Sequence, residues 1–138
     1  VPVMAEALCL LGREGAVVLH SREGLDEAGL ERATDLGLLS QGSLRTEVLN
    51  PRDYDLTPAP TSALQGGDLA ENAAILARVL QGSGAPAQQD VVALNAALAL
   101  QVAGVASDWK TGIAQAREIL ASGAAWDRLQ KLVDFLSA

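Results

Sequence analysis

Apolar residues recur at helical spacing in five stretches of the chain, and four of these stretches are followed by a glycine. The residue just past a helix end often adopts the left-handed backbone conformation, which glycine reaches without a steric penalty. The pattern therefore predicts five helices. They cover residues 3–11, 69–81, 87–103, 109–122 and 125–136, with Gly12, Gly82, Gly104 and Gly123 after the first four.

Start signals agree with three of these helices. Asp68, with Glu71 three residues later, fits a capping box, and Asp108 is placed to cap the fourth helix. Pro86 suits the first turn of the third helix, where its missing N–H has no helical partner. Asn is a poor helix former, so we expect two asparagines inside helices to bind the backbone of neighbouring segments. These are Asn72 and Asn95.

The strand pattern is confined to the first third of the chain. Residues 15–20 form a short apolar run after a glycine turn, which predicts a strand buried on both faces, as in a parallel sheet. Residues 34–39 and 44–49 flank Gln41-Gly42-Ser43 and predict a hairpin with a short loop. Prolines then mark an irregular crossing segment over residues 50–62. The order of elements indicates an α/β fold that ends in a set of packed helices.

Composition narrows the class of protein. The 138 residues suffice for about one domain, and 49% apolar with 20% charged residues is typical of a globular chain. A net charge of −7 and only 3% aromatic residues argue against a nucleic-acid partner or an anionic membrane surface. One cysteine and one histidine form neither an internal disulfide nor a zinc site, which fits a reducing, cytoplasmic compartment.

Two features bear on whether the chain contains a membrane segment and whether it is part of a longer protein. Its longest apolar stretch, residues 91–106, contains Asn95 and Gln101 and is shorter than a membrane span, so we expect no membrane segment. The chain begins at Val1 and not at Met, and it enters a predicted helix within its first residues, so we expect it to be a portion of a longer protein.

The candidate chemistry follows the first predicted strand. In α/β sheets, ligands bind beyond the carboxyl ends of strands, and this strand leads into a loop that contains Asp26 and Glu27. Adjacent side chains point in different directions, so the pair suits two metal ions better than one. Hard carboxylate oxygens with a partly hydrated ion are typical of Mg²⁺ shared with substrate phosphates. A solvated loop without metal is the commoner reason for such a pair.

Four groups of residues resemble one known family nearly from end to end of the chain. His20, Gly24-Leu25-Asp26-Glu27 and Thr34 resemble the strand-loop signature of anthranilate phosphoribosyltransferase. Three later stretches support the resemblance. The whole match corresponds to well under half of a full enzyme of this family. They are Leu64 to Asp68 with Glu71-Asn72-Ala73, then Leu94-Asn95-Ala96-Ala97 with Gly104, then Gly112, Ala116, Ser122-Gly123 and Leu129.

The resemblance implies a fold and a domain assignment. The fold is the α/β domain of the nucleoside phosphorylases and related phosphoribosyltransferases. Residues 1–138 correspond to the C-terminal portion of that domain, with a strand-bearing part over residues 1–60 and a helical part over 61–138. The N-terminal helical domain of the family is absent from these residues.

The resemblance also implies a reaction, the transfer of phosphoribosyl from phosphoribosyl pyrophosphate to anthranilate in tryptophan biosynthesis. In the family, the acidic pair of this loop holds Mg²⁺ ions on the pyrophosphate. The resemblance therefore implies the same role for Asp26 and Glu27. The family's phosphate loop and anthranilate-binding residues lie upstream, so no catalytic or substrate-binding residue is assigned here. We expect the full-length protein to be a homodimer and the isolated chain to be inactive.

Several residues near the acidic pair depart from the family pattern or stay open. Ser21 stands where the family usually has glycine, which affects the shape of the loop more than the metal role. Gly66-Gly67-Asp68 is interpreted as a turn with a helix cap and not as a phosphate loop. His20 closes a strand and could orient the acidic loop, and we favour a packed or hydrogen-bonded histidine over a catalytic base. Arg22 either screens the acidic pair or contacts phosphate.

Two alternative functions remain. A pyrimidine nucleoside phosphorylase relative would share the architecture but use free phosphate. A non-catalytic remnant would persist as a packing or dimerisation module.

Overall fold

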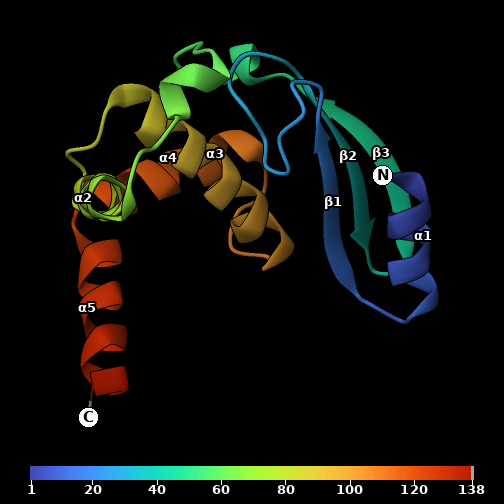
Figure 1. The fold of residues 1–138 in the computed structure, drawn as a ribbon. Helices are drawn as coiled ribbons and strands as arrows, with labels where there is room; N and C mark the ends of the chain where they lie inside the picture. Colours follow the sequence, from blue (N-terminus) through green and yellow to red (C-terminus); the bar gives the residue numbers. More distant parts are fainter. Residues whose placement is uncertain (138) are drawn as a thin grey trace.

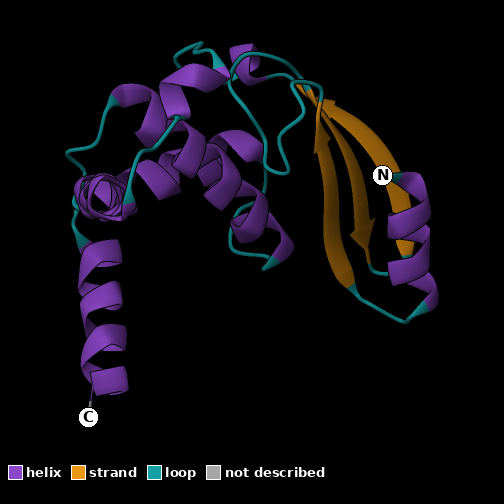
Figure 2. Cartoon of the chain, viewed as in Figure 1, coloured by secondary structure: helices purple, strands orange, loops and turns teal. Residues whose placement is uncertain are grey.

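The computed structural model describes residues 1–137 as one short sheet beside a group of helices (Figures 1 and 2). The strands are β1 (Gly15–Ser21), β2 (Thr34–Ser40) and β3 (Ser43–Leu49). The α-helices are α1 (Pro2–Leu10), α2 (Leu69–Leu80), α3 (Pro86–Val102), α4 (Trp109–Ala121) and α5 (Ala124–Ser137). Two 3₁₀ turns, η1 (Pro51–Asp53) and η2 (Thr61–Leu64), lie in the crossing segment between the sheet and α2.

The sheet has the order β1-β2-β3, and both pairings are antiparallel. The predicted hairpin is confirmed: Ser40 pairs with Ser43 across a two-residue turn. Both turn residues have positive φ, 49° at Gln41 and 76° at Gly42, which is the backbone of the turn that matches the natural twist of a hairpin. This turn sets the register of β2 against β3.

The environment predicted for β1 is wrong in the described residues. β1 pairs only with β2, in antiparallel orientation, from Gly15↔Ser40 to Ser21↔Thr34. Its side chains are mostly half-exposed, and only Val18 and Ser21 are buried. The physical reason is that β1 is an edge strand among the described residues. Val17 and Leu19 on one face pack against the helical core. Val18 on the other face lies beside α1, so helices cover the strand in part on both faces.

The predicted helices are confirmed to within one or two residues at their ends. Gly12, Gly82, Gly104 and Gly123 all have φ between 71° and 74°, as expected for residues just past a helix. Asp68 accepts a hydrogen bond from the Glu71 N–H (2.9 Å), and Asp108 accepts one from the Thr111 N–H (2.8 Å). The caps therefore satisfy N–H groups that have no partner within the helix.

The core is centred on the contact between α3 and α4. Ala93, Leu94 and Ala97 of α3 are fully buried, and Ile113 and Ala116 of α4 pack in the same cluster. Gly112 allows this close approach, because a Cβ added there would lie 2.9 Å from the Cβ of Ala97. The small residues thus bring the two helices into backbone contact.

Two polar contacts attach other parts of the chain to this helix pair. Trp109 of α4 is buried, and its Nε1–H donates to Glu47 of β3 (2.7 Å). Asp90 of α3 accepts from the Thr57 N–H of the crossing segment (2.8 Å) and from Arg117 of α4 (2.7 Å). The sheet and the crossing segment are therefore both joined to α3 and α4.

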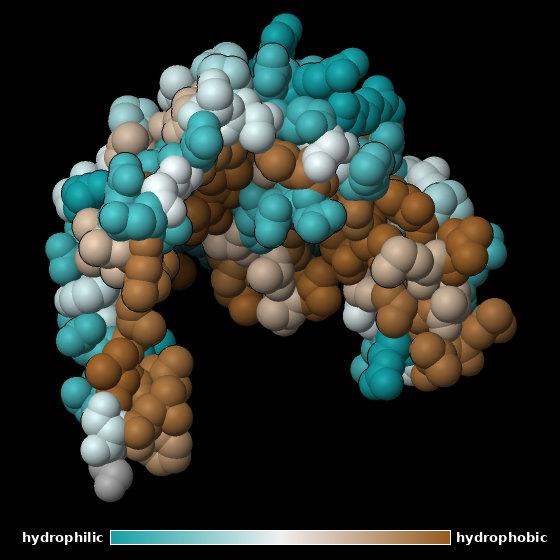
Figure 3. All heavy atoms as spheres, viewed as in Figure 1, coloured by the Kyte–Doolittle hydropathy of each residue, from teal (hydrophilic) through white to brown (hydrophobic). Residues whose placement is uncertain are grey.

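Apolar side chains remain exposed on the C-terminal helix. Figure 3 shows an apolar surface along the distal half of α5, where Leu132, Val133, Phe135 and Leu136 are 47–77% exposed. No other described residue covers this face of α5.

No helix within residues 1–137 combines the length and apolar character needed to cross a lipid bilayer.

Replacing Gly112 by alanine is expected to destabilise the chain by about 1–3 kcal/mol, because the added methyl group forces α3 and α4 apart. The loss occurs although alanine is the better helix former by about 1 kcal/mol. Urea unfolding followed by circular dichroism measures it. Ala114→Gly, at an exposed position of the same helix, measures the propensity term alone, and a stabilised Gly112→Ala variant would contradict the packing argument.

Acid is expected to remove the contribution of Asp90 to stability. Burial raises the pKa of Asp90, but the Thr57 N–H and Arg117 lower it by more, so its pKa in the folded chain lies below the usual value. A depressed folded pKa means that the stabilisation is complete above the unfolded pKa of about 3.9 and is lost as the pH falls through the folded pKa. The Tm difference between wild type and Asp90→Asn should therefore be largest near neutral pH and shrink below about pH 4. Asp134→Asn, at an exposed position of α5, is the control, and a Tm difference that is constant with pH would contradict the assignment.

Candidate functional site

The two predicted acidic residues lie in the connection between β1 and β2, residues 22–33, which we call the acidic loop. Its two ends are held together by a backbone hydrogen bond from the Arg22 N–H to the Ala33 carbonyl (3.0 Å). The Arg22 side chain crosses the same base and binds Asp35 through its Nε (3.1 Å) and terminal (2.6 Å) nitrogens. The loop therefore leaves and rejoins the sheet at one place.

A carboxylate inside the loop fastens it to the crossing segment. Glu23 accepts hydrogen bonds from the Thr61 hydroxyl (2.9 Å), the Glu31 N–H (3.4 Å) and the Ser21 hydroxyl (3.4 Å). Its carboxylate lies against Gly29, where any Cβ would overlap it. Glu23 thus ties the first and last parts of the loop to each other and to η2.

A second fastening comes from α3. The Asn95 side chain accepts a hydrogen bond from the Ala28 N–H (2.9 Å) and donates one to the Ala28 carbonyl (2.9 Å). Its amide also donates to the Val91 carbonyl of its own helix (2.9 Å). The expectation that Asn95 binds the backbone of a neighbouring segment is therefore confirmed. The segment is the acidic loop, and the bound residue, Ala28, directly follows Glu27.

Asp26 and Glu27 lie between these two fastenings and are both exposed. Ala28, the next residue, is completely buried. Within residues 1–137 neither carboxylate forms a hydrogen bond or an ion pair, and no group of three or more acidic, His or Cys side chains is arranged to enclose a metal ion. The loop therefore has a held backbone and two hydrated carboxylates that face solvent.

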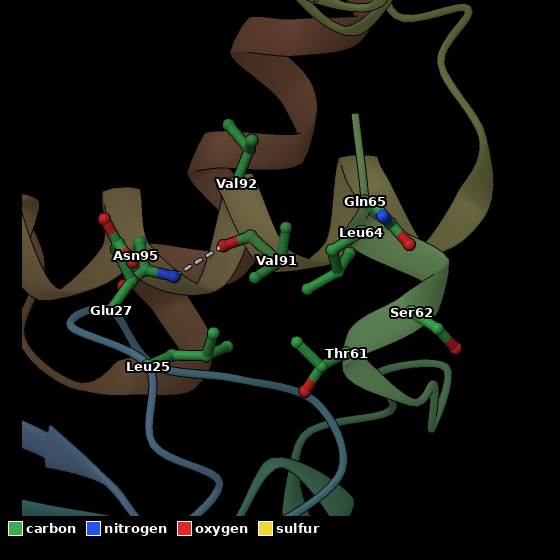
Figure 4. A pocket seen from close by; sticks show the side chains of 9 residues that line it. All are labelled: Leu25, Glu27, Thr61, Ser62, Leu64, Gln65, Val91, Val92 and Asn95. Atoms are coloured by element: carbon green, nitrogen blue, oxygen red, sulfur yellow. Dashed lines mark hydrogen bonds between the residues drawn. The ribbon is translucent and has the colours of Figure 1, made fainter. Parts of the chain in front are cut away.

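A cavity of about 650 Å³ opens beside the acidic pair (Figure 4). Glu27 and Asn95 line one end of it, and Thr61, Leu64 and Gln65 line the end near η2. The remaining lining residues are Leu25, Ser62, Val91 and Val92. The cavity therefore lies between the acidic loop, the crossing segment and α3, the three segments that the Glu23 and Asn95 contacts join.

The structure bears on two residues whose roles the sequence left open. Arg22 pairs with Asp35 and lowers the pKa of that carboxyl group, so in this structure its charge is directed to Asp35 and not to the acidic pair. His20 is exposed and forms no side-chain hydrogen bond within residues 1–137, so the favoured interpretation of a packed or hydrogen-bonded histidine is wrong. The reason is that His20 lines an open cavity, together with Val1 and Pro2 at the start of α1 and Thr46 of β3, and is not covered by them.

Other expectations near the site are resolved by backbone contacts. Ser21 is fully buried, and its hydroxyl accepts a hydrogen bond from the Glu23 N–H (3.3 Å), so the departure from the family's glycine is absorbed locally. Asn72 binds both the N–H (2.9 Å) and the carbonyl (3.1 Å) of Gly67. Together with the Asp68 cap, this confirms the interpretation of Gly66-Gly67-Asp68 as a structural turn.

Glu23 is the residue that sequence reasoning missed. Its main partner, Thr61, is 38 residues away in the chain, and no spacing pattern connects them. The only local signal is Gly29, whose missing side chain leaves the space that the Glu23 carboxylate occupies.

Replacing Glu23 by alanine is expected to destabilise the chain by about 1–3 kcal/mol and to speed amide exchange over residues 22–33, because the loop loses its link to Thr61. Thermal unfolding and hydrogen exchange with peptide resolution measure the two effects. Glu31→Ala removes the same charge from an exposed position of the same loop and should leave both quantities nearly unchanged. Equal effects from the two variants would show that charge, and not the tether, is responsible.

Known proteins are similar in sequence to this chain over nearly its whole length. Anthranilate phosphoribosyltransferase from Synechococcus sp. (strain JA-3-3Ab) is 84% identical over 138 residues, and a second one from Nostoc sp. is 56% identical over 135 residues. The chain spans 40% and 37% of the length of these relatives.

Solved structures agree with the sequence comparison. The crystal structure of anthranilate phosphoribosyltransferase from Thermus thermophilus is similar to 98% of this chain, with a TM-score of 0.88 and 39% identity, over 39% of its own length. The enzyme from Saccharomyces cerevisiae in complex with PRPP and Mg is similar to 99% of this chain, with a TM-score of 0.87 and 27% identity, over 39% of its own length.

A family comparison covers almost the same residues. The family described as "Glycosyl transferase family, a/b domain" matches residues 1–126, which include the sheet, the acidic loop and helices α1 to α4. The chain therefore belongs to the glycosyl transferase family and represents part of its a/b domain.

Proposed function

We propose that the chain is the metal-binding part of an anthranilate phosphoribosyltransferase, which transfers phosphoribosyl from phosphoribosyl pyrophosphate to anthranilate in tryptophan biosynthesis. The observation that carries the proposal is the exposed Asp26-Glu27 pair on a loop fastened on both sides. The relatives named above support it, because they bear this name and one yeast structure is described as a complex with PRPP and Mg.

The donor set of the acidic loop fits Mg²⁺. Two carboxylates without protein partners offer hard oxygen ligands to Mg²⁺ ions that keep several waters and share the rest of their ligands with substrate phosphates. The absence of a third protein ligand among residues 1–137 agrees with such a shared site and would not suit a closed structural metal site. In the proposal, Asp26 and Glu27 hold the metal, and when bound Mg²⁺ supplies positive charge that stabilises the departing pyrophosphate.

The chain's own residues contribute by positioning. The Asn95 and Glu23 contacts hold the backbone on each side of the acidic pair, so the carboxylates are presented at a fixed place beside the cavity. Arg22 is engaged with Asp35 at the base of the loop, and this pair leaves the negative charge of Asp26 and Glu27 available to a cation. Residues that bind phosphoribosyl and anthranilate belong, in the proposal, to the part of the relatives' length that this chain does not span.

The proposal extends to the state of the whole protein. It describes a cytoplasmic homodimer in which residues 1–138 are the C-terminal portion of the α/β domain. Two other functions, a pyrimidine nucleoside phosphorylase relative and a non-catalytic packing module, receive no support from the names of the similar proteins.

The test is a chimera in which these 138 residues replace the matching 40% of the Synechococcus sp. (strain JA-3-3Ab) enzyme. We expect Mg²⁺-dependent formation of phosphoribosyl anthranilate by the chimera and none by the isolated chain. Asp26→Ala or Glu27→Ala in the chimera should lower the rate by about 10²-fold or more, the scale of one lost electrostatic stabiliser.

Glu31→Ala is the matched control, because it removes an exposed acid from the same loop, and it should retain the rate of the chimera. A correctly folded chimera without transferase activity would refute the proposal. Phosphorolysis of a pyrimidine nucleoside would favour the first alternative, and no activity with either substrate would favour the packing module. Unchanged rates in both acidic variants would remove Asp26 and Glu27 from the metal site.

A further inference from the structure

We propose that Asn95 is a positioning residue for metal binding, acting through Ala28 on the orientation of the acidic pair. The inference rests on the proposed function and deepens it, since it assigns a role to a helix residue whose side-chain amide is engaged with backbone groups. Two features carry it, the two-sided bond to one backbone residue and the place of that residue directly after Glu27.

The bond fixes a peptide plane on each side of Ala28. The Ala28 N–H belongs to the peptide group that it shares with Glu27, and the Ala28 carbonyl belongs to the next peptide group. Both are held at 2.9 Å by one planar amide, so neither peptide can rotate without breaking a hydrogen bond. The backbone that carries the Glu27 side chain is therefore oriented by α3.

The amide is itself held in place. Its remaining N–H donates to the Val91 carbonyl one turn earlier in α3 (2.9 Å), as Figure 4 shows, so the acceptor and both donors of Asn95 are used. A leucine or alanine here fills space in the helix but satisfies neither polar group of Ala28, which is completely buried. The chemistry of an asparagine is thus required by the loop and not by the helix.

Positions that orient metal ligands without touching the metal commonly change metal affinity by about 10- to 100-fold when they are mutated. Asn95 does not bind the side chain of a proposed metal ligand. It acts less directly, through the main chain that carries Glu27. We therefore expect an effect near the lower end of that range, together with a loosened loop.

The experiment uses the same chimera with Asn95→Leu. Binding of Mn²⁺ in the presence of pyrophosphate, followed by electron paramagnetic resonance, reports metal affinity without turnover. We expect the dissociation constant to rise about 10-fold. Hydrogen exchange of metal-free protein should become faster over residues 26–30, and the Mg²⁺ concentration for half-maximal rate should rise while the KM for anthranilate is unchanged.

Asn72→Leu is the matched control. Asn72 also lies in a helix and also binds both the N–H and the carbonyl of one backbone residue, Gly67, which is outside the acidic loop. This variant loses the same kinds of hydrogen bond and should lower thermal stability without changing Mn²⁺ affinity. If Asn95→Leu does not fold, Asn95→Ala removes the same bonds without a branched side chain and is judged by the same criteria.

The outcomes separate this inference from the proposed function. If Asp26→Ala and Glu27→Ala weaken Mn²⁺ binding but Asn95→Leu behaves like Asn72→Leu, the positioning role is refuted and the metal site stands. If neither acidic variant weakens Mn²⁺ binding, the metal site is refuted and the positioning role with it. Weaker binding in Asn95→Leu, with unchanged binding in Asn72→Leu, supports the inference.

Discussion

The two irregular connections of the chain are held by polar side chains of one helix. α3 supplies Asn95 to the acidic loop and Asp90 to the crossing segment, and in both cases the partner is a backbone group that has no strand or helix to bind it. Buried main-chain groups must be paired, because leaving one unsatisfied costs about 1–3 kcal/mol. The position of α3 therefore helps to set where both connections lie, together with the Glu23–Thr61 contact and the Arg117 contact to the Asp55 carbonyl.

The position of α3 depends in turn on small residues. Ala93 and Ala97 are fully buried, and Gly112 of α4 lies within backbone contact of Ala97. Such packing holds two helices at one separation, because a single added methyl group overlaps its neighbours. The same short segment of α3 serves both contacts. Residues 93–97 supply the alanines that pack against α4 and also the asparagine that binds the acidic loop. A shift of α3 would move that asparagine, so the precision of the loop rests on the core.

Local signals in the sequence predict most of the helices and the hairpin, and non-local contacts account for what they miss. Glycines with positive φ, the Asp68 and Asp108 caps and the Gln41-Gly42 turn are determined within a few neighbouring residues, so they are readable without the fold. The pairing of β1 is not, because an apolar strand is equally compatible with a parallel neighbour and with an antiparallel neighbour plus helices against its faces. The acidic pair is visible in the sequence, and its metal role stays a prediction that depends on the family resemblance. Its support comes from Thr61 and Asn95, which lie 38 residues from Glu23 and 67 residues from Ala28 along the chain, beyond the reach of any motif spacing.

The acidic loop combines an ordered backbone with two carboxylates that remain exposed to solvent. Two adjacent carboxylates repel each other least in water, and burial would raise the free energy of their charged forms. A flexible loop would keep them hydrated but would have to lose backbone freedom when a cation binds, at about 1–2 kcal/mol per residue. In this chain the ordering is provided by neighbours: the loop is bound at Glu23 and Ala28, while Asp26 and Glu27 between them stay exposed. The charge remains solvated and the geometry is already restricted, which is the combination that a hydrated divalent cation shared with a phosphate requires.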